Sequence, residues 1–225
     1  MNAQLLSGVG IDYRRGGRQI LDGIDVRAYA GEALAVTGPS GSGKSSLLAL
    51  LAGLEPSAGD VRLDDVRVRP DDVAMRRRFG LVLQGYGLVS VLTATENVEV
   101  VLQARGMARD EIRPRAAAAL AAVRLEGQGD QLVEELSGGQ QQRLAVARAL
   151  VTEAEVLLAD EPTAELDAET RKVVLDVLLE QARRDAIVVI ATHDPEVAEA
   201  CDRELRLVGG RMSTDALLRR QVEPV

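Results

Sequence analysis

The sequence predicts a single α/β domain whose core is interrupted by a mainly helical insertion. First, the apolar run Ala33–Thr37 leads into a glycine-rich loop that is followed by an apolar stretch of helical character. Second, the apolar runs Val156–Ala159 and Ile187–Ala191 have the length of buried parallel strands and enclose a helical pattern over Ala168–Arg183. Third, the composition changes after Gly87 towards Ala, Leu, Arg and Glu, which favour helices. Strands that alternate with helices in this way indicate a parallel sheet.

The overall composition fits one globular domain. The chain has 225 residues, of which 46% are apolar and 28% charged, and a chain of this size can bury a sizeable core. Aromatic residues make up only 2%, so the core must be aliphatic. The formal net charge of −8 argues against nucleic acid as a main partner, because nucleic acids attract basic surfaces.

The cysteine content and the apolar stretches bear on location. Cys201 is the only cysteine, so no disulfide can form within the chain, which fits a reducing compartment. Met1–Arg15 lacks the basic and apolar segments of a signal peptide. The longest apolar stretches, such as Leu47–Leu54 and Ala186–Ala191, are too short to span a bilayer. We therefore expect a soluble chain, with any membrane-spanning part supplied by another protein.

Residues 1–87 combine short apolar runs with turn signals. Gly16-Gly17 separates two runs of imperfect alternation and indicates a turn between strands. Gly53 is a stop signal for the helix that follows the glycine-rich loop. We expect strands over Val9–Tyr13, Ile20–Val26, Ala33–Thr37, Asp60–Arg69 and Phe79–Gln84, and a helix over Ser45–Leu54.

The rest of the chain forms the insertion and the second part of the core. We expect helices over Glu96–Ala104 and Arg109–Val123. The tract Ala116–Ala122 is flanked by arginines, and a membrane-surface helix is the alternative to the ordinary solvated helix that we favour. Leu205–Met212 reads as a final hairpin that turns at Gly209-Gly210. These elements divide the single domain 1–225 into an α/β core (1–87 and 149–213), a helical subdomain (88–148) and a short C-terminal tail (214–225).

The glycine-rich loop satisfies the phosphate-loop pattern in full. Its glycines let backbone N–H groups converge on phosphates, and the following helix directs its positive end at them. Lys44 would reach the β- and γ-phosphates, and the Ser45 hydroxyl would coordinate Mg²⁺. A chance glycine loop is the alternative, and the strand before and the helix after argue against it. The nucleotide-binding residues expected here are Gly38, Pro39, Ser40, Gly41, Ser42, Gly43, Lys44, Ser45 and Ser46.

Two carboxylates and the only histidine follow the later apolar runs. Asp160 and Glu161 end the run that begins at Val156; Asp160 would hold Mg²⁺, and Glu161 would polarise the attacking water. The alternative is an ordinary polar strand end. His193 lies one β–α–β step further on, so it can emerge on the same edge of the sheet. We favour a γ-phosphate contact for His193 over a structural or solvated histidine.

Gln84 and Tyr13 are two further candidate residues of the nucleotide site. Gln84 stands where the core passes into the insertion, so it is placed to sense both nucleotide and partner, whereas a polar strand end is the alternative. Tyr13 would stack on adenine, or it is a half-buried strand tyrosine. After Gln84, the segment Gly85–Leu88 combines backbone freedom with the contact area of Tyr86 and Leu88. It either docks a partner or packs on the insertion.

A second glycine-rich segment, Leu136–Gln140, lies far from Lys44 in the sequence and shortly before Asp160. Its composition suggests a surface that holds the same phosphate from the opposite side. One chain would struggle to fold both glycine-rich elements onto one nucleotide, whereas two copies that face each other would not.

This order of motifs resembles the nucleotide-binding subunit of ATP-binding cassette (ABC) transporters over nearly the whole chain. Leu136–Gln140, called the signature segment below, matches the family signature together with the following residues Gln141-Gln142-Arg143. The other matches are Tyr13 for adenine stacking, Gln84 for the glutamine loop and a Mg²⁺ ligand, Asp160 for Mg²⁺, Glu161 for catalysis, Leu166-Asp167 for the loop that crosses the dimer interface, and His193 for the switch histidine. The resemblance implies a phosphate-loop, RecA-like core and a head-to-tail dimer with two ATP molecules at its interface. Each ATP would be held by the phosphate loop of one copy and by Ser137, Gly138, Gly139 and Gln140 of the other.

Within the family, Leu157–Thr163 resembles the lipoprotein-releasing and macrolide-exporter type, whose ATPases are also short. Because only the tail 214–225 follows the last expected strand, we expect no C-terminal regulatory domain, as in the ATPases of that type. There are departures from the pattern: Ala164 stands where many relatives have Gly, Glu165 precedes Leu166, and Ser90 stands where Pro is common. None of them touches an expected catalytic position.

The resemblance implies an ATP-hydrolysing subunit that pairs with a second ABC ATPase subunit, with a homodimer as the expected form. ATP and Mg²⁺ are its expected cofactors, and an integral membrane permease is its expected partner. The chain would be cytoplasmic and peripheral on the inner face of the cell membrane. A groove near Gly85–Val91 would receive a cytoplasmic helix of the permease.

Two other functions compete with this interpretation of the sequence. The main one is a soluble ABC-type ATPase that remodels ribosomes or DNA. Such proteins usually carry two cassettes, a coiled coil or a metal-binding insertion, and this sequence has one cassette, one cysteine and no heptad tract. The more distant one is a phosphate-loop kinase, against which the signature segment speaks, because a kinase needs no second phosphate cradle.

Overall fold

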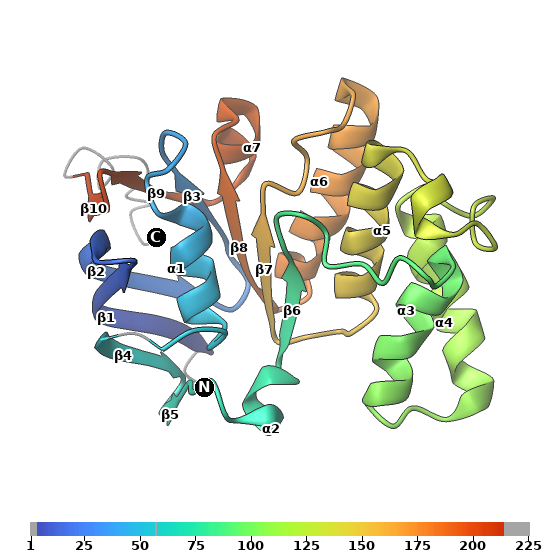
Figure 1. The fold of residues 1–225 in the computed structure, drawn as a ribbon, viewed down its shortest axis with the longest axis horizontal. Coiled ribbons are helices and arrows are strands. Elements are labelled where there is room, and N and C mark those ends of the chain that lie inside the picture. Colours follow the sequence, from blue (N-terminus) through green and yellow to red (C-terminus); the bar gives the residue numbers. More distant parts are fainter. Residues whose placement is uncertain (1–3, 57, 214–225) are drawn as a thin grey trace, which may run out of the picture.

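The computed structural model describes residues 4–56 and 58–213. A six-stranded sheet stands in the middle of the molecule (Figure 1). The first helix and a four-stranded sheet lie on one side of it, and the helices of the insertion lie on the other. The long helices are α1 (Lys44–Leu51), α3 (Ala94–Ala104), α4 (Arg109–Ala122), α5 (Gly138–Leu150) and α6 (Ala168–Arg183).

The central sheet has the strand order β10-β9-β3-β8-β7-β6. Its strands are β3 (Ala33–Thr37), β6 (Phe79–Val82), β7 (Val156–Asp160), β8 (Ile187–Thr192), β9 (Arg203–Val208) and β10 (Arg211–Met212). Every pair except β9–β10 is parallel. The carboxyl ends of β3, β6, β7 and β8 therefore meet at one edge of the sheet, where open α/β sheets bind their ligands. The predicted final hairpin is confirmed, with its turn at Gly209-Gly210.

Side chains of the central strands alternate between two apolar cores. In β3, Leu34 and Val36 pack with α1 and the smaller sheet, whereas Ala33 and Ala35 pack with the helical side. In β8, Val188 joins the helical side in the same way. Because both faces are covered, these strands are apolar throughout, as the sequence predicts for buried parallel strands.

The smaller sheet has the order β2-β1-β4-β5 and is antiparallel. Its strands are β1 (Leu5–Arg15), β2 (Arg18–Tyr29), β4 (Ala58–Leu63) and β5 (Val66–Arg67). The turn at Gly16-Gly17 is confirmed, and the strands beside it are longer than predicted because register shifts disturb their alternation. The single strand predicted over Asp60–Arg69 is wrong: the chain turns at Asp64, whose φ is +54°, and divides it into β4 and β5.

Several helices differ from the prediction. Helix α1 ends at Leu51, three residues early, and Gly53 with its φ of +63° stops it. Two short helices, α2 (Val73–Arg76) and α7 (Pro195–Ala200), were not predicted. Helix α5 was missed because the signature segment was interpreted only as a glycine-rich loop.

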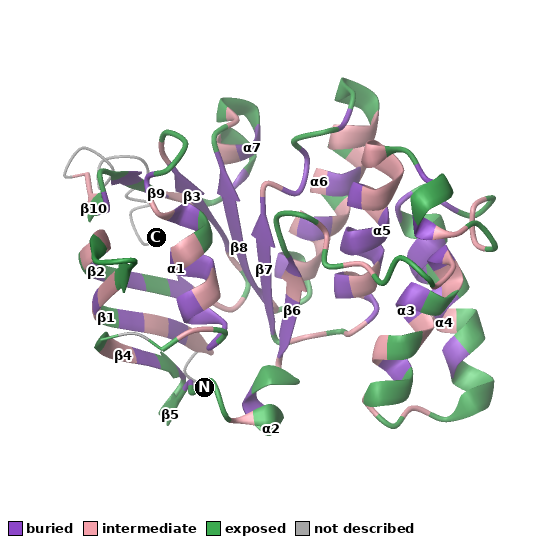
Figure 2. Cartoon of the chain, in the orientation of Figure 1, coloured by how far each residue is buried: buried purple, intermediate pink, exposed green. Residues whose placement is uncertain are grey.

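The helical layer has an alanine-rich, aliphatic interior. Ala116, Ala119 and Leu120 of α4 are buried in it, and the outward surface of α4 is exposed (Figure 2). This burial favours an ordinary solvated helix over a membrane-surface helix for the tract Ala116–Ala122. Among residues 4–56 and 58–213, no helix combines the length and the apolar character needed to cross a membrane.

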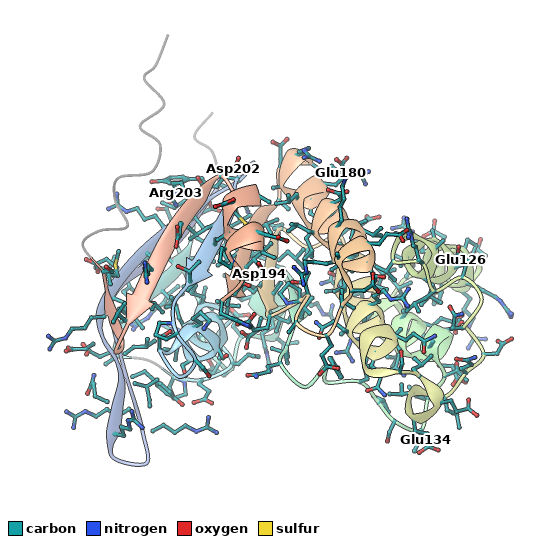
Figure 3. The ribbon with its side chains drawn as sticks, turned by 90° about the horizontal axis from the view of Figure 1, so that it is seen from above. Glu126, Glu134, Glu180, Asp194, Asp202 and Arg203 are labelled. Atoms are coloured by element: carbon teal, nitrogen blue, oxygen red, sulfur yellow. The ribbon has the colours of Figure 1, made fainter. Side chains whose placement is uncertain are left out.

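Polar contacts join the start of β9 to the start of β3. They lie at the amino-terminal edge of the sheet, opposite the carboxyl ends of the strands. Asp202 accepts a hydrogen bond of 2.8 Å from the backbone N–H of Ala33, and Arg203 pairs with Glu32 at 2.8 Å. Seen from above, these residues lie far from the helical layer, which carries Glu126 and Glu134 (Figure 3). The preceding Cys201 is buried, which raises the pKa of its thiol to about 12.

The packing of α3 gives a test of the fold. Leu102 is fully buried in the helical layer, whereas Leu54 is 39% exposed. We expect Leu102→Ala to lower the free energy of unfolding by about 2–5 kcal/mol, because it removes buried methyl groups and leaves a cavity. The matched Leu54→Ala should cost clearly less, and denaturant unfolding measures both. Equal losses would contradict the placement of α3.

Candidate functional site

An open cleft of about 1020 Å³ lies at the carboxyl edge of the central sheet. Its walls come from the loops after β3, β6, β7 and β8, as the parallel topology requires. Eleven of the residues predicted for the site line this cleft: Pro39, Ser40, Gly41, Gly43, Lys44, Ser45, Ser46, Gln84, Asp160, Glu161 and His193. Residues distant in the sequence thus meet around one space large enough for a nucleotide.

The phosphate loop has a conformation that only glycine tolerates at its ends. Gly38 has a φ of +141°, and a Cβ there would collide with the backbone carbonyl of Leu207. Gly43 has a φ of +104°, and a Cβ there would collide with the side chain of Leu21. Lys44 is 7% exposed and donates hydrogen bonds to the carbonyls of Gly38 (2.9 Å) and Pro39 (3.3 Å). The loop therefore curls around its own lysine at the start of α1.

Asp160 and Ser45 form a pair of oxygen ligands beside the loop. Asp160 is 5% exposed, its Oδ1 has no hydrogen-bond partner among the described residues, and its burial raises the pKa of the carboxyl. The Ser45 hydroxyl lies beside the same carboxylate and partly opposes this rise in its pKa. A buried carboxylate oxygen left unpaired is the donor that a hard cation requires. The described residues hold no cluster of three or more His, Cys, Asp or Glu that would bind a metal alone. The donor set thus fits Mg²⁺, whose remaining ligands are usually water and phosphate.

Glu161 connects the carboxyl ends of β7 and β8. Its φ is +48°, a rare conformation for a residue other than glycine, and its N–H bonds the carbonyl of Ala191 at 2.9 Å. Its Oε1 lies 2.8 Å from Nδ1 of His193 and 3.9 Å from Nζ of Lys44. The imidazole of His193 is 67% exposed. The carboxylate is thus held at the cleft between a cation and an exposed imidazole, as a residue acting on water or phosphate should be.

The signature segment forms the start of α5, outside the cleft. The Ser137 hydroxyl caps the helix by accepting a hydrogen bond of 3.3 Å from the N–H of Gln140, and the side-chain oxygen of Gln140 accepts one of 2.8 Å from the N–H of Ser137. A Cβ on Gly138 would collide with the carboxylate of Glu165. None of the residues 137–140 lines the cleft. The start of this 13-residue helix has the partial positive charge that attracts anions.

Tyr13 and Asp167 also lie outside the cleft. The hydroxyl of Tyr13 contacts Glu55 instead, and the cleft wall from β1 and β2 is made by residues such as Arg15 and Arg18. The structure does not bring Tyr13 into the cleft, and its role in adenine stacking stays a prediction. Asp167 caps α6 by accepting a hydrogen bond of 2.9 Å from the N–H of Thr170, and this bond lowers the pKa of its carboxyl.

Gln142 and Glu165 are cleft residues that the sequence analysis did not assign to the site. Gln142 is buried and lines the cleft, and its Nε2 has no hydrogen-bond partner in the part of the chain that the structure describes. The capping box at Ser137 indicates that a helix begins there. Gln142 lies one turn after Gly138, so this helix would have placed both residues on the same face. Glu165 also lines the cleft, although the sequence distinguishes it only as a departure from the family pattern.

The profile of the ABC transporter family matches residues 21–164, more than half of the chain. This chain belongs to the ABC transporter family. The resemblance and the fold class predicted from the sequence are thereby confirmed, and the chain is an ATP-binding cassette.

Its relatives include short and long ABC proteins. The lipoprotein-releasing system ATP-binding protein LolD of Chromohalobacter salexigens is 42% identical over 213 residues, which cover 91% of this chain and 90% of LolD. The macrolide export ATP-binding/permease protein MacB of Marinobacter nauticus is 40% identical over 202 residues, which cover 87% of this chain. The chain spans only about a third of MacB, since 31% of that protein is covered.

The similar solved structures include the ATP-binding cassette MJ0796, a dimer in a post-hydrolysis state bound to ADP and Pi. It superimposes with a TM-score of 0.86 at 33% identity and covers 92% of this chain and 96% of its own. The ABC fold of this chain is therefore shown by sequence and by structure.

The separation of Lys44 from Ser137 gives a test of the site. Lys44→Ala should weaken ATP binding by the isolated subunit by about 10- to 100-fold, because hydrogen bonds to charged groups contribute about 1.5–3 kcal/mol. Ser137→Arg should leave this affinity unchanged, because Ser137 lies outside the cleft. Titration of dilute protein with ATP measures both. Equal weakening would place Ser137 in the site of its own chain.

Proposed function

We propose that this chain is the ATP-hydrolysing subunit of an ABC transporter and that two copies act head to tail. The observation that carries the proposal is the position of the signature segment. Phosphate loop, Asp160, Glu161 and His193 share one cleft, and the signature segment lies outside it at the start of α5. A second copy in the opposite orientation would supply that helix start to the phosphates in the cleft. The dimeric MJ0796 cassette with ADP and Pi supports this arrangement.

Hydrolysis would be performed by the residues at the carboxyl edge. Lys44 would bind the β- and γ-phosphates, and Ser45, Asp160 and Gln84 would hold Mg²⁺. The ion would supply charge neutralisation on the phosphate oxygens. Glu161 would orient a water and accept its proton while the oxygen attacks the γ-phosphorus and ADP leaves. His193 is hydrogen-bonded to Glu161 at 2.8 Å and would hold that carboxylate in place and contact the γ-phosphate.

The second copy would complete each phosphate site. Ser137, Gly138, Gly139 and Gln140 would present a hydroxyl, an amide and backbone N–H groups to the γ-phosphate. Asp167 caps α6 next to Leu166, in the loop that would cross the interface. ATP binding would thus close the pair, and loss of the γ-phosphate would open it.

A membrane-spanning partner would dock beside Gln84. The names of LolD and MacB assign those relatives to a lipoprotein-releasing system and to macrolide export, and we extend the transporter role to this chain. Val89 is 42% exposed and Val91 is 78% exposed. Tyr86 is half-buried and packs against the helical core, so the docking contact belongs to the two valines. The subunit would then lie at the inner face of the cell membrane.

The role of Glu161 predicts a trapped dimer. Glu161→Gln should bind Mg-ATP but hydrolyse it about 10²- to 10⁴-fold more slowly, because the amide cannot act as a general base. ATP should then hold two copies together in sedimentation or size-exclusion experiments. Ser137→Arg in the same background should return the protein to a monomer. A Glu161→Gln protein that binds ATP and stays monomeric would refute the two-copy site.

The exposed valines predict where the permease binds. Val91→Asp should leave ATP binding intact and weaken assembly with the permease about tenfold or more, because a carboxylate would lose its water in the contact. Co-purification from solubilised membranes and stimulation of ATP hydrolysis by the permease measure this. Val73→Asp is the control, since Val73 is 58% exposed at the start of α2. Equal effects of the two changes would place docking elsewhere.

A further inference from the structure

The connection from β6 to α3 contains a strained segment, Gly85–Gly87, directly after Gln84. Its three residues all have positive φ, at +82° for Gly85, +63° for Tyr86 and +59° for Gly87. Glycine adopts this region freely, but a tyrosine does so at a cost in conformational energy. Such strain persists only where surrounding contacts hold the backbone in place. The contacts of Tyr86 and Gly87 therefore have to account for it.

Arg148, in the last turn of α5, makes two of these contacts. Its Nη1 donates a hydrogen bond of 2.6 Å to the carbonyl of Gly87, and its Nη2 donates one of 2.8 Å to the carbonyl of Tyr86. Burial lowers the pKa of this guanidinium. Within the described residues no carboxylate pairs with it, so these two carbonyls are its hydrogen-bond partners. A charge is buried in this way only where its hydrogen bonds are specific.

The other end of α5 is connected to the same segment. The hydroxyl of Tyr86 lies beside the carboxylate of Glu165, and burial together with this neighbour raises the pKa of Tyr86 to about 12. The Glu165 carboxylate in turn lies against Gly138 of the signature segment. Arg148 and Gly138 are about 15 Å apart along the helix, at 1.5 Å per residue. The strained segment thus contacts α5 at its C-terminal turn and, through Glu165, at its N-terminus, and in Figure 1 the β6–α3 connection crosses in front of α5.

We propose that Arg148 is a positioning residue that fixes the signature segment relative to Gln84. With its two hydrogen bonds to the strained segment in place, α5 is held at the angle that directs Ser137 and Gly138 to the ATP of the second copy. Movement of Gly85–Gly87 would shift the whole helix, because an α-helix moves as a rigid rod over this length. The inference rests on the proposed two-copy function and adds a residue outside the cleft that controls it.

Arg105 offers a matched control for Arg148. It too is a partly buried arginine whose guanidinium bonds two backbone carbonyls, those of Thr152 and Arg77, each at 2.6 Å. It does not touch the strained segment. Arg148→Met and Arg105→Met therefore remove the same chemistry from two places, and a general loss of stability affects both.

The test uses the Glu161→Gln protein, in which ATP traps the dimer. Arg148→Met should keep the ATP affinity of the monomer and weaken ATP-dependent dimerisation about tenfold or more, as expected when hydrogen bonds from a charged group are lost. Arg105→Met should leave dimerisation unchanged. Arg148→Lys should restore part of it, because an ammonium still donates to carbonyls. Analytical ultracentrifugation with and without Mg-ATP measures dimerisation, and ATP titration of dilute protein measures affinity.

The outcomes separate the inference from the function on which it rests. A parent protein that binds ATP and never dimerises refutes the two-copy site. If the parent dimerises and the Arg148→Met and Arg105→Met variants dimerise equally well with ATP, the role of Arg148 is overturned. If Arg148→Met does not fold, Arg148→Gln tests the same contact, since its shorter amide cannot reproduce the two hydrogen bonds to the carbonyls of Tyr86 and Gly87. Faster hydrogen exchange at residues 137–140 in this variant, without a change in global stability, supports the proposal, and unchanged exchange and dimerisation contradict it.

Discussion

The parallel pairing of β3, β8 and β7 is the constraint on which the site depends. It brings the ends of these strands to one edge, so Lys44, Asp160 and His193 meet although they are far apart in the sequence. A parallel sheet needs long crossover connections, and these must be covered by helices on both faces. The aliphatic helical layer and α1 therefore form parts of the core, and they also make possible the parallel sheet whose edge carries the cleft. The same geometry explains why the catalytic groups come from loops and strand ends rather than from the middle of any element.

In the proposed two-copy site, a second constraint is that one chain would supply two half-sites on different surfaces. The cleft holds the phosphate loop and the carboxylates, and the start of α5 carries the signature segment. The proposal thereby separates binding from hydrolysis, because ATP binding would need one copy and hydrolysis would need two. The strained segment Gly85–Gly87 lies between these surfaces and contacts both, through Gln84 on one side and through Arg148 and Glu165 on the other.

The sequence predicts the parts whose signals are local. The strand Ala33–Thr37 and the helix Ala168–Arg183 agree with the structure at both ends, because apolar runs and helix caps define them within a few residues. The split of Asp60–Arg69 depends on a single aspartate that adopts a positive φ, which composition does not specify. The direction in which the Tyr13 side chain points depends on register shifts in β1. The hydrogen bonds of Arg148 join residues some sixty positions apart in the sequence. Such long-range contacts have no local signal, so they became visible only in the folded chain.

The burial of Cys201 makes this protein convenient for spectroscopic labelling. Thiol reagents attack the thiolate, and a pKa of about 12 keeps the only native thiol protonated and shielded. A cysteine introduced at an exposed position, such as Val91 or Ser90, would therefore be modified selectively without removal of the native one. Paired fluorophores or spin labels on two copies would then report the opening and closing of the assembly as a change in distance. The burial of Cys201 thus allows labels at introduced cysteines to follow the opening and closing of the two copies directly.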